Sequence, residues 1–212
     1  MAAQSDNSNE KTSEDLLNHT GEGVVVDIGT GDGRFVYRSA AENPHKFYIG
    51  IDANAAPLAK ISMKATRKPA KGGLANVLFV QAAIENLPEE LNGSADEIHI
   101  HFPWGSLLKT VALGEENALA ALRRIGAPEC ILEIIIGIDE ARDKTEIERL
   151  ALPRLTDEYL RETLLPTYER AGFQVLESGS LVPSEWSRIE TSWARRLQSN
   201  DNRQCVYFVL RV

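Results

Sequence analysis

The sequence of 212 residues has no apolar run close to the roughly 20 residues that a membrane-spanning helix needs. Its polar, acidic N-terminus, residues 1–20, lacks the apolar centre of a secretory signal peptide, and we expect this segment to be flexible. Only two cysteines are present, Cys130 and Cys205, and both lie in apolar runs, which favours a buried, reduced state. These absences predict a cytoplasmic protein that does not contact a membrane.

Acidic residues are missing from one part of an otherwise acidic chain. The net charge of −8 disfavours a large polyanion as a general partner, yet no acid lies between Asp52 and Glu85. Five basic residues do, which we call the basic segment: Lys60, Lys64, Arg67, Lys68 and Lys71. Their spacing places them on one face if the segment is helical. Since solvated helices normally mix both signs, the segment favours contact with an RNA backbone, an ordinary solvated face being the alternative.

A glycine-rich loop follows the first strand-like run. Residues 24–33 read VVVDIGTGDG, a β-branched strand that ends in Asp27 and opens into alternating glycines, which let the backbone approach a ligand closely. A dinucleotide site needs Gly-x-Gly-x-x-Gly, whereas here the third glycine comes one residue early, and Asp27 and Asp32 would repel a pyrophosphate. Asp52, after the second strand-like run, is placed to bind ribose hydroxyls. The pattern predicts a methyltransferase whose cofactor is S-adenosylmethionine.

Strand-like and helical patterns alternate along the chain. The strand-like runs are Val24–Ile28, Phe47–Ile51, Val77–Val80, Glu97–Phe102 and Cys130–Ile138, and the helical patterns are Arg34–Glu42, Pro57–Lys68 and Glu115–Ile125. A helix from Thr156 to Ala171, interrupted at Pro166, precedes an antiparallel pair at Phe173–Leu176 and Cys205–Val212. We expect residues 21–212 to form one α/β domain, with the Rossmann-like fold of class I methyltransferases: a seven-stranded, mostly parallel sheet with an antiparallel C-terminal strand.

Two connections, roughly Asp139–Leu155 and Pro183–Arg203, exceed ordinary loop length, and we expect substrate recognition there. The second connection contains Trp193, while Trp104 follows the fourth strand, between a proline and a glycine that favour a loop. Two such rings would sandwich one purine, and each stack is worth about 1–3 kcal/mol. That offsets the few kcal/mol needed to unstack a base. Trp186 is interpreted as a packing residue.

His99 and His101 lie on the same face of a strand, and no third metal ligand stands at a useful spacing. We interpret them as a structural pair.

Three runs together resemble the KamB/NpmA family of aminoglycoside-resistance methyltransferases, which modify N1 of adenine 1408 in the decoding site of 16S ribosomal RNA. These runs are Lys68–Leu74, Pro103–Leu108 and Thr191–Leu197, and the resemblance extends from about Val24 to the end of the chain. It implies methyl transfer from S-adenosylmethionine to that adenine in the 30S subunit, near helix 44, by a monomer. The net negative charge departs from what we expect of this family.

The resemblance also implies roles for individual residues. Trp104 and Trp193 would enclose a flipped adenine, with Pro103 and Thr191 beside its edge. The cofactor-binding residues would be Asp27, Gly29, Thr30, Gly31, Asp52, Ala83, Ile84, Glu85, Ser106 and Leu107. Contacts to RNA would come from the basic segment and from Arg195, Arg196 and Arg203. Because adenine N1 carries a lone pair and the sulfonium methyl is already activated, the reaction needs positioning rather than a strong base.

Three other functions remain open. A tRNA guanine-N7 methyltransferase shares the glycine loop, but its usual Phe-x-Asp-Pro-Trp pattern has an aspartate that this chain lacks. A small-molecule methyltransferase would fit the acidic charge and leave the basic segment unexplained. A non-catalytic protein that binds cofactor and RNA is disfavoured by the presence of Asp27, Asp52 and both tryptophans.

Overall fold

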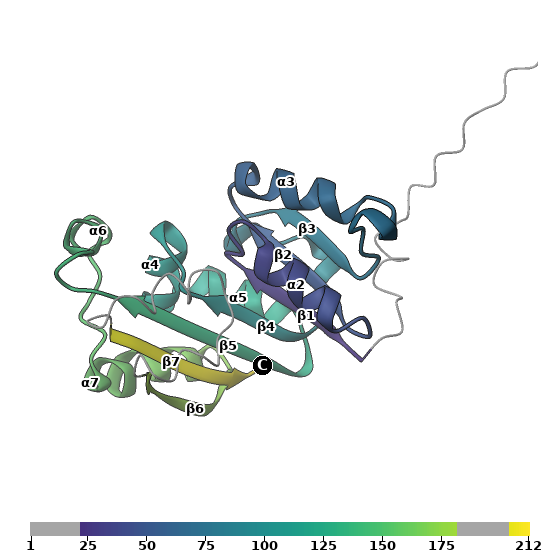
Figure 1. Ribbon diagram of the computed structural model, residues 1–212. Coiled ribbons are helices and arrows are strands. Elements are labelled where there is room, and N and C mark those ends of the chain that lie inside the picture. The colour runs from purple at the N-terminus through teal and green to yellow at the C-terminus, as the bar shows by residue number, and fades with distance from the viewer. Residues whose placement is uncertain (1–21, 182–203) are drawn as a thin grey trace, which may run out of the picture.

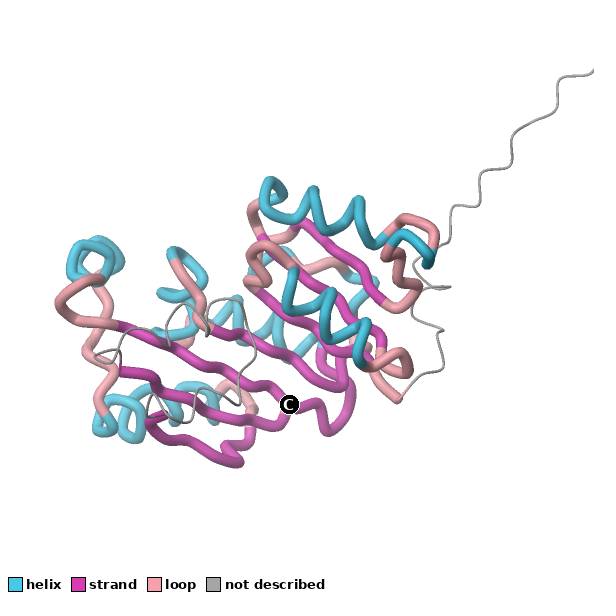
Figure 2. Tube along the Cα trace, viewed as in Figure 1, coloured by secondary structure: helices cyan, strands magenta, loops and turns pink. Residues whose placement is uncertain are grey.

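The computed structural model describes residues 22–181 and 204–212, whose strands form one seven-stranded sheet of order β3-β2-β1-β4-β5-β7-β6 (Figure 1, Figure 2). The strands are β1 (Val24–Ile28), β2 (Phe47–Asp52), β3 (Val77–Gln81), β4 (Ala95–His101), β5 (Gly126–Ile138), β6 (Gln174–Leu181) and β7 (Gln204–Arg211). The first five are parallel, and β7 is antiparallel to both β5 and β6. The predicted fold class is confirmed.

Helices cover both faces of this sheet. They are α2 (Arg34–Glu42), α3 (Ala55–Ala65), α4 (Gly105–Leu113), α5 (Glu116–Ile125), α6 (Lys144–Leu150), α7 (Asp157–Tyr159) and α8 (Leu165–Arg170). A π-helical turn at Leu160–Leu164 and 3-10 turns at Pro69–Lys71, Ile84–Asn86 and Glu89–Leu91 complete the described elements. Helices α2 and α3 lie on one face, and α4 and α5 pack on the other (Figure 1). Helix α8 packs on the same face as α4 and α5, since its Leu165 and Tyr168 share a buried cluster with them. No helix in the described ranges has the length and apolar character to cross a membrane.

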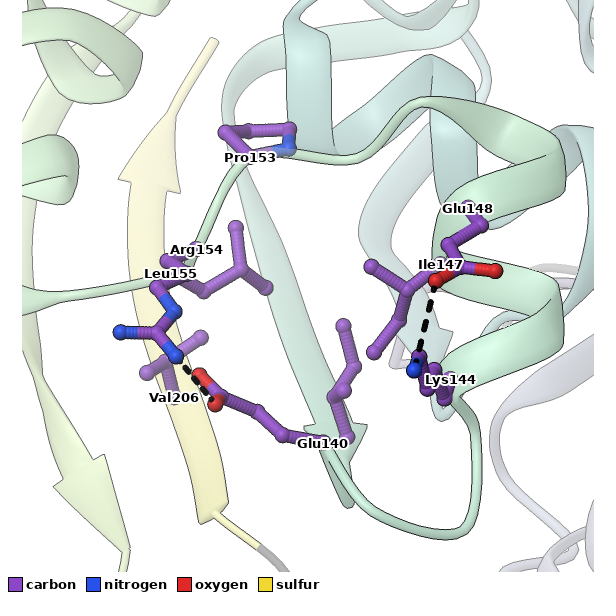
Figure 3. A pocket seen from close by; sticks show the side chains of 9 residues that line it. Glu140, Lys144, Ile147, Glu148, Pro153, Arg154, Leu155 and Val206 are labelled. Atoms are coloured by element: carbon purple, nitrogen blue, oxygen red, sulfur yellow. Dashed lines mark hydrogen bonds and ion pairs between the residues drawn. The ribbon is translucent and has the colours of Figure 1, made fainter.

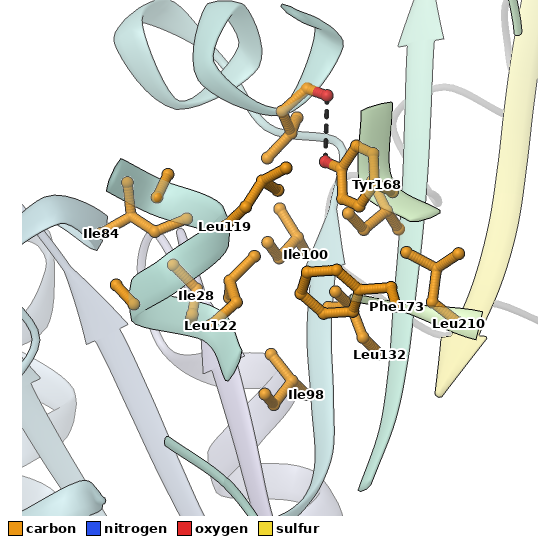
Figure 4. Close-up of a cluster of buried hydrophobic side chains, with 14 of the residues drawn as sticks. Ile28, Ile84, Ile98, Ile100, Leu119, Leu122, Leu132, Tyr168, Phe173 and Leu210 are labelled. Atoms are coloured by element: carbon orange, nitrogen blue, oxygen red, sulfur yellow. Dashed lines mark hydrogen bonds between the residues drawn. The ribbon is translucent and has the colours of Figure 1, made fainter. Parts of the chain in front are cut away.

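Strand β1 explains the two layers. All five of its residues are buried, as expected for a central strand covered on both sides. Because side chains alternate along a strand, Val24, Val26 and Ile28 face the larger core cluster, whereas Val25 faces the smaller cluster under α2. The larger cluster includes isoleucines and leucines of β4, β5 and α5 around the buried ring of Tyr168 (Figure 4). A rigid central sheet therefore fixes the edge at which β1 to β4 end.

The helical segment before β6 confirms the predicted start and interruption. The Thr156 side chain accepts a hydrogen bond from the Tyr159 N–H at 3.1 Å, which caps the helix. The π-helical turn comes directly before α8, which has Pro166 near its start. Proline has no N–H to donate to the preceding turn, so the regular helical pattern is interrupted there.

Several predicted elements differ from the structure: β5 begins at Gly126 rather than Cys130, and β6 extends to Leu181 rather than Leu176. The predicted helix over Pro57–Lys68 is shorter, since α3 ends at Ala65 and Lys68, before Pro69, has φ −58° and ψ 145°. A residue before proline is disfavoured in helix, which explains the early end. The predicted connection Asp139–Leu155 contains helix α6, and helix α4 was not predicted at all.

Candidate functional site

A cleft of about 360 Å³ opens where β1, β2, β3 and β4 end. Parallel α/β sheets bind ligands at this carboxyl edge of their strands. The residues that line the cleft are Ile28, Gly29, Gly31, Asp52, Ala53, Asn54, Ala82, Ala83, Ile84, Glu85, Phe102, Pro103, Trp104, Ser106 and Leu107. The structure therefore brings together the predicted cofactor residues except Asp27 and Thr30, and adds Pro103 and Trp104 from the loop after β4.

The glycine loop approaches α4 too closely for a side chain. Gly29 has φ +79°, and a Cβ built on it would lie 2.5 Å from the Leu107 side chain. Gly31 also has a left-handed φ, of +60°, but a Cβ there would meet nothing within 4 Å. The loop therefore lies close to α4 at Gly29, whereas the space beside Gly31 is open. A ligand can approach the backbone there because no side chain is in the way.

Asp52 is fixed by the backbone around it. Its Oδ2 accepts a hydrogen bond from the Gly31 N–H and its Oδ1 accepts one from the Asn54 N–H, both at 2.8 Å. Each carboxylate oxygen retains capacity for another donor. The half-buried carboxylate is thus held at the cleft wall with acceptor capacity to spare, and its contact with a ribose stays a prediction.

Asp27 and Thr30 lie behind the cleft surface. Asp27 is 6% exposed, and burial raises the pKa of its carboxyl group, while the nearby His101 acts in the opposite direction. The Thr30 N–H donates to the Ile51 carbonyl at 3.0 Å, and its buried hydroxyl lies near the Asp27 carboxyl group, where it lowers the pKa of that group. Neither residue lines the cleft, and their contact with a cofactor stays a prediction.

Trp104 stands at the rim of the cleft and is not a core residue. Its side chain is 45% exposed, and it occupies the residue before α4 with an extended backbone (φ −135°). The neighbouring Pro103 is buried and lines the same cleft. An exposed indole beside a nucleoside-sized cleft provides a flat surface on which a base can stack.

The sequence matches the family described as NpmA: 16S rRNA (adenine(1408)-N(1))-methyltransferase over residues 5–211. The chain belongs to the NpmA family.

Individual proteins of this kind are similar to the chain over most of its length. The 16S rRNA (adenine(1408)-N(1))-methyltransferase of Streptoalloteichus tenebrarius is 37% identical over 180 residues, 85% of this chain and 82% of the relative. The crystal structure of the aminoglycoside resistance methyltransferase NpmB1 superposes with a TM-score of 0.81 at 43% identity, covering 95% of this chain and 94% of that one. A variant of the Catenulisporales acidiphilia enzyme, solved with its cosubstrate SAM, gives 0.84 at 34% identity, covering 95% and 91%.

The predicted single face of the basic segment is wrong, because α3 ends before Arg67. Lys60, Lys64 and Arg67 nevertheless line one hollow of about 350 Å³ between α2 and α3, together with Arg34 and Tyr37, which the sequence analysis missed. We call this the basic hollow; Asp32, Pro57 and Ile61 complete its lining. Lys68 and Lys71 do not line it. The signal for the two missed residues was their spacing of three on the helix that follows the glycine loop.

Contacts within the basic hollow order its side chains. The Lys64 ammonium lies 4.0 Å from the centre of the Tyr37 ring. The Tyr37 hydroxyl donates to the Gly72 carbonyl at 2.5 Å, which ties α2 to the turn after α3. Arg34 is paired with Asp32 at 3.4 Å, both on the exposed rim. Asp32 of the glycine loop is part of the lining, so the hollow places positive charge near the candidate cofactor cleft.

His99 and His101 form a stacked pair, as the interpretation of a structural pair requires. Their ring centres are 4.9 Å apart, and His101 Nε2 lies 2.5 Å from Glu133 Oε1. This bond lowers the pKa of Glu133. Burial and the neighbouring His101 lower the pKa of His99 to about 4. Both residues lie on β4, where His99 is in register with Asp27 and Glu133 and His101 with Ile135, and neither histidine lines the cleft.

A second cavity, of about 270 Å³, lies between α6 and β7 and is separate from the predicted site (Figure 3). Its walls include Ile138, Leu155 and Val206, and ion pairs join Glu140 to Arg154 at 3.0 Å and Lys144 to Glu148 at 3.8 Å. Most of its lining residues belong to the connection Asp139–Leu155, where the sequence analysis expects substrate recognition, and that expectation stays a prediction. The other predicted site residues lie outside the described residues: Thr191, Trp193, Arg195, Arg196 and Arg203. Trp186 lies outside them as well.

Proposed function

We propose that the protein transfers a methyl group from S-adenosylmethionine to N1 of adenine 1408 in the 16S rRNA of the 30S subunit, and thereby confers aminoglycoside resistance. The observation that carries this proposal is the pairing of a nucleoside-sized cleft with an exposed Trp104 at its rim, in a chain that belongs to the NpmA family. Relatives named for this reaction cover most of the chain.

The cleft residues fit S-adenosylmethionine. Asp52 would accept hydrogen bonds from the ribose hydroxyls, and the segment Ala82–Glu85 would frame the adenine. The backbone at Gly29 and Gly31 would run along the methionine end, where the absence of side chains leaves room. When bound, the cofactor supplies a methyl group that is already activated by the sulfonium.

The role of the protein in the reaction is positioning. The Trp104 ring would stack on the extruded adenine, and Pro103 would lie beside the edge of the base. Adenine N1 has its own lone pair, so no side chain has to remove a proton before transfer. The methylated ring becomes cationic, and backbone carbonyls together with the Asp27 region would stabilise that charge electrostatically. We propose the same roles for Trp193 and Thr191 that the family resemblance implies.

The basic hollow would hold the rRNA backbone. The chain has a net charge of −8, so the cations of the basic hollow would attract the RNA backbone locally. The acidic remainder of the surface would repel it. That balance favours one docked orientation over general RNA binding. We propose that the protein docks as a monomer in the cytoplasm, against the helix 44 region of the 30S subunit, with Lys68, Lys71, Arg195, Arg196 and Arg203 adding contacts.

Reverse transcription across the decoding region tests this function. Isolated 30S subunits are incubated with the protein and S-adenosylmethionine, with a matched reaction that omits the cofactor. N1 methylation blocks the Watson–Crick edge, so the proposal expects a cofactor-dependent stop at adenine 1408. Absence of that stop, in a preparation that binds the cofactor by calorimetry, would contradict it. Transfer of a labelled methyl group from S-adenosylmethionine to tRNA by the same preparation would then support the guanine-N7 alternative.

A further inference from the structure

The residue that joins β4 to the Trp104 loop has an unusual backbone. Phe102 has φ +51°, in the left-handed region that bulky side chains rarely adopt. The other non-glycine residues with positive φ in the described ranges are Glu129 and Ala151, and neither lines the cleft. A strained residue persists only where its surroundings hold it, and such residues cluster at functional sites.

Two sets of contacts hold Phe102. Its N–H donates a hydrogen bond of 2.7 Å to the Ile135 carbonyl on β5. Its ring packs on Gly137 of the same strand, where an added Cβ would lie 3.0 Å from Phe102 Cδ1 and 3.1 Å from Cys205 Sγ. Gly137 is paired with Cys205 across β5 and β7, so the ring sits in a notch formed by two strands. The side chain is buried, at 7% exposure.

The turn after Phe102 contains a second residue with a left-handed backbone. Gly105 also has a left-handed backbone, with φ +62°, and open space around it. The turn therefore has a left-handed residue at each end, with Pro103 and the extended Trp104 between them. A glycine at position 102 would adopt the same backbone without strain. Since the chain has a phenylalanine at this position, the ring and its packing on Gly137 are what position 102 adds to the turn.

We infer that Phe102 is a positioning residue whose ring, seated on Gly137, sets the direction in which Trp104 projects at the rim of the cleft. The inference deepens the proposed function, because it rests on Trp104 as the surface that stacks on the target adenine. It assigns the anchor of that surface to β5 and β7, which lie two and three strands away from β1, the strand that precedes the glycine loop.

Two alanine substitutions of strand glycines separate positioning from general damage. Gly137→Ala puts a methyl group against the Phe102 ring. Gly179→Ala is the matched control on β6, since a Cβ there would lie 3.1 Å from the Tyr207 ring, remote from the cleft. Both proteins are labelled with 5-fluorotryptophan, and the Trp104 fluorine resonance is assigned with Trp104→Phe. Melting temperature, cofactor affinity and kcat for methylation of 30S subunits are measured in parallel.

The inference expects both variants to lose similar thermal stability. Only Gly137→Ala should shift the Trp104 resonance and lower kcat, by about tenfold or more, since small misplacements of positioning groups are costly. Cofactor affinity should stay close to that of the parent protein. An unmoved Trp104 resonance in folded Gly137→Ala would overturn the inference, as would an equal loss of kcat in the control. The resonance needs no RNA substrate, so it tests the anchor even if the proposed substrate is wrong.

A second variant covers the case in which Gly137→Ala does not fold. Phe102→Gly keeps the left-handed backbone accessible and removes only the ring. The inference expects a shifted Trp104 resonance and a reduced kcat at unchanged cofactor affinity. A parent-like resonance would contradict it, and a large loss of cofactor affinity would show that Phe102 acts on the cofactor directly.

Discussion

The Asp52 carboxylate accepts the Gly31 N–H at 2.8 Å, so the predicted ribose-binding acid is tied to the glycine loop across the β1–β2 edge. One residue thus has two effects: it orients a carboxylate toward the cleft and it fixes the loop that faces the cofactor. Its removal should therefore damage cofactor binding more than the loss of one ligand contact would.

Asp52→Asn is expected to weaken binding of S-adenosylmethionine by about tenfold or more, since hydrogen bonds to charged groups are worth about 1.5–3 kcal/mol. Isothermal titration calorimetry measures the change. Asp96→Asn is the matched control, because Asp96 accepts the Val24 N–H at 2.7 Å at the other end of β1. The control should retain cofactor affinity; equal losses in both variants would indicate general loosening of the strand.

Local patterns allowed the residues that line the candidate cofactor cleft to be predicted from the sequence. The strand, the alternating glycines and Asp52 are each defined by a few neighbouring residues, and the parallel sheet brings them to one edge. The prediction of a single basic face was wrong for two reasons. Lys68 precedes Pro69, so α3 ends early. The basic hollow is also lined by residues of α2, which are distant in the sequence. The packing of the Phe102 ring could not be predicted from the sequence, because it depends on Gly137 and Cys205, which lie on two other strands far along the chain.

Trp104→Ala should lower methylation of 30S subunits by about 5- to 150-fold, the range given by a stack of about 1–3 kcal/mol. Cofactor affinity should change little, because the ring is 45% exposed at the rim. Trp104→Phe should recover part of the rate. Leu176→Ala, which truncates another exposed apolar side chain, serves as the control. A parent-like rate for Trp104→Ala would rule out stacking by this ring.

The double variant Lys64→Glu/Arg67→Glu should bind 30S subunits more weakly and show a flatter dependence on salt. Each lost phosphate contact reduces the slope of log K against log salt by about 0.7–0.9. Arg161→Glu/Arg170→Glu changes the net charge by the same amount away from the basic hollow. Fluorescence anisotropy over a salt series compares them. If both double variants lose the same slope, net charge rather than the hollow controls docking.

The His99–His101 pair predicts a loss of stability in mild acid. The pKa of His99 is lowered to about 4 in the folded protein, mainly by burial, so the unfolded chain takes up a proton between pH 6.5 and 4 that the folded protein does not. Stability should therefore fall as the pH drops through this window, by an amount on the order of 3 kcal/mol at most. Facing groups include Glu97, Glu133, Lys46 and His101, and Glu133 is stabilised as the carboxylate by His101.

Urea denaturation at a series of pH values measures the effect. His99→Gln removes the titrating group and should flatten the dependence between pH 6.5 and 4, because no buried imidazole then resists protonation. His45→Gln replaces an exposed histidine before β2 and should keep the dependence of the parent protein. A His99→Gln protein that loses stability as steeply as the parent would place the acid sensitivity in other groups, such as the Glu133 carboxylate.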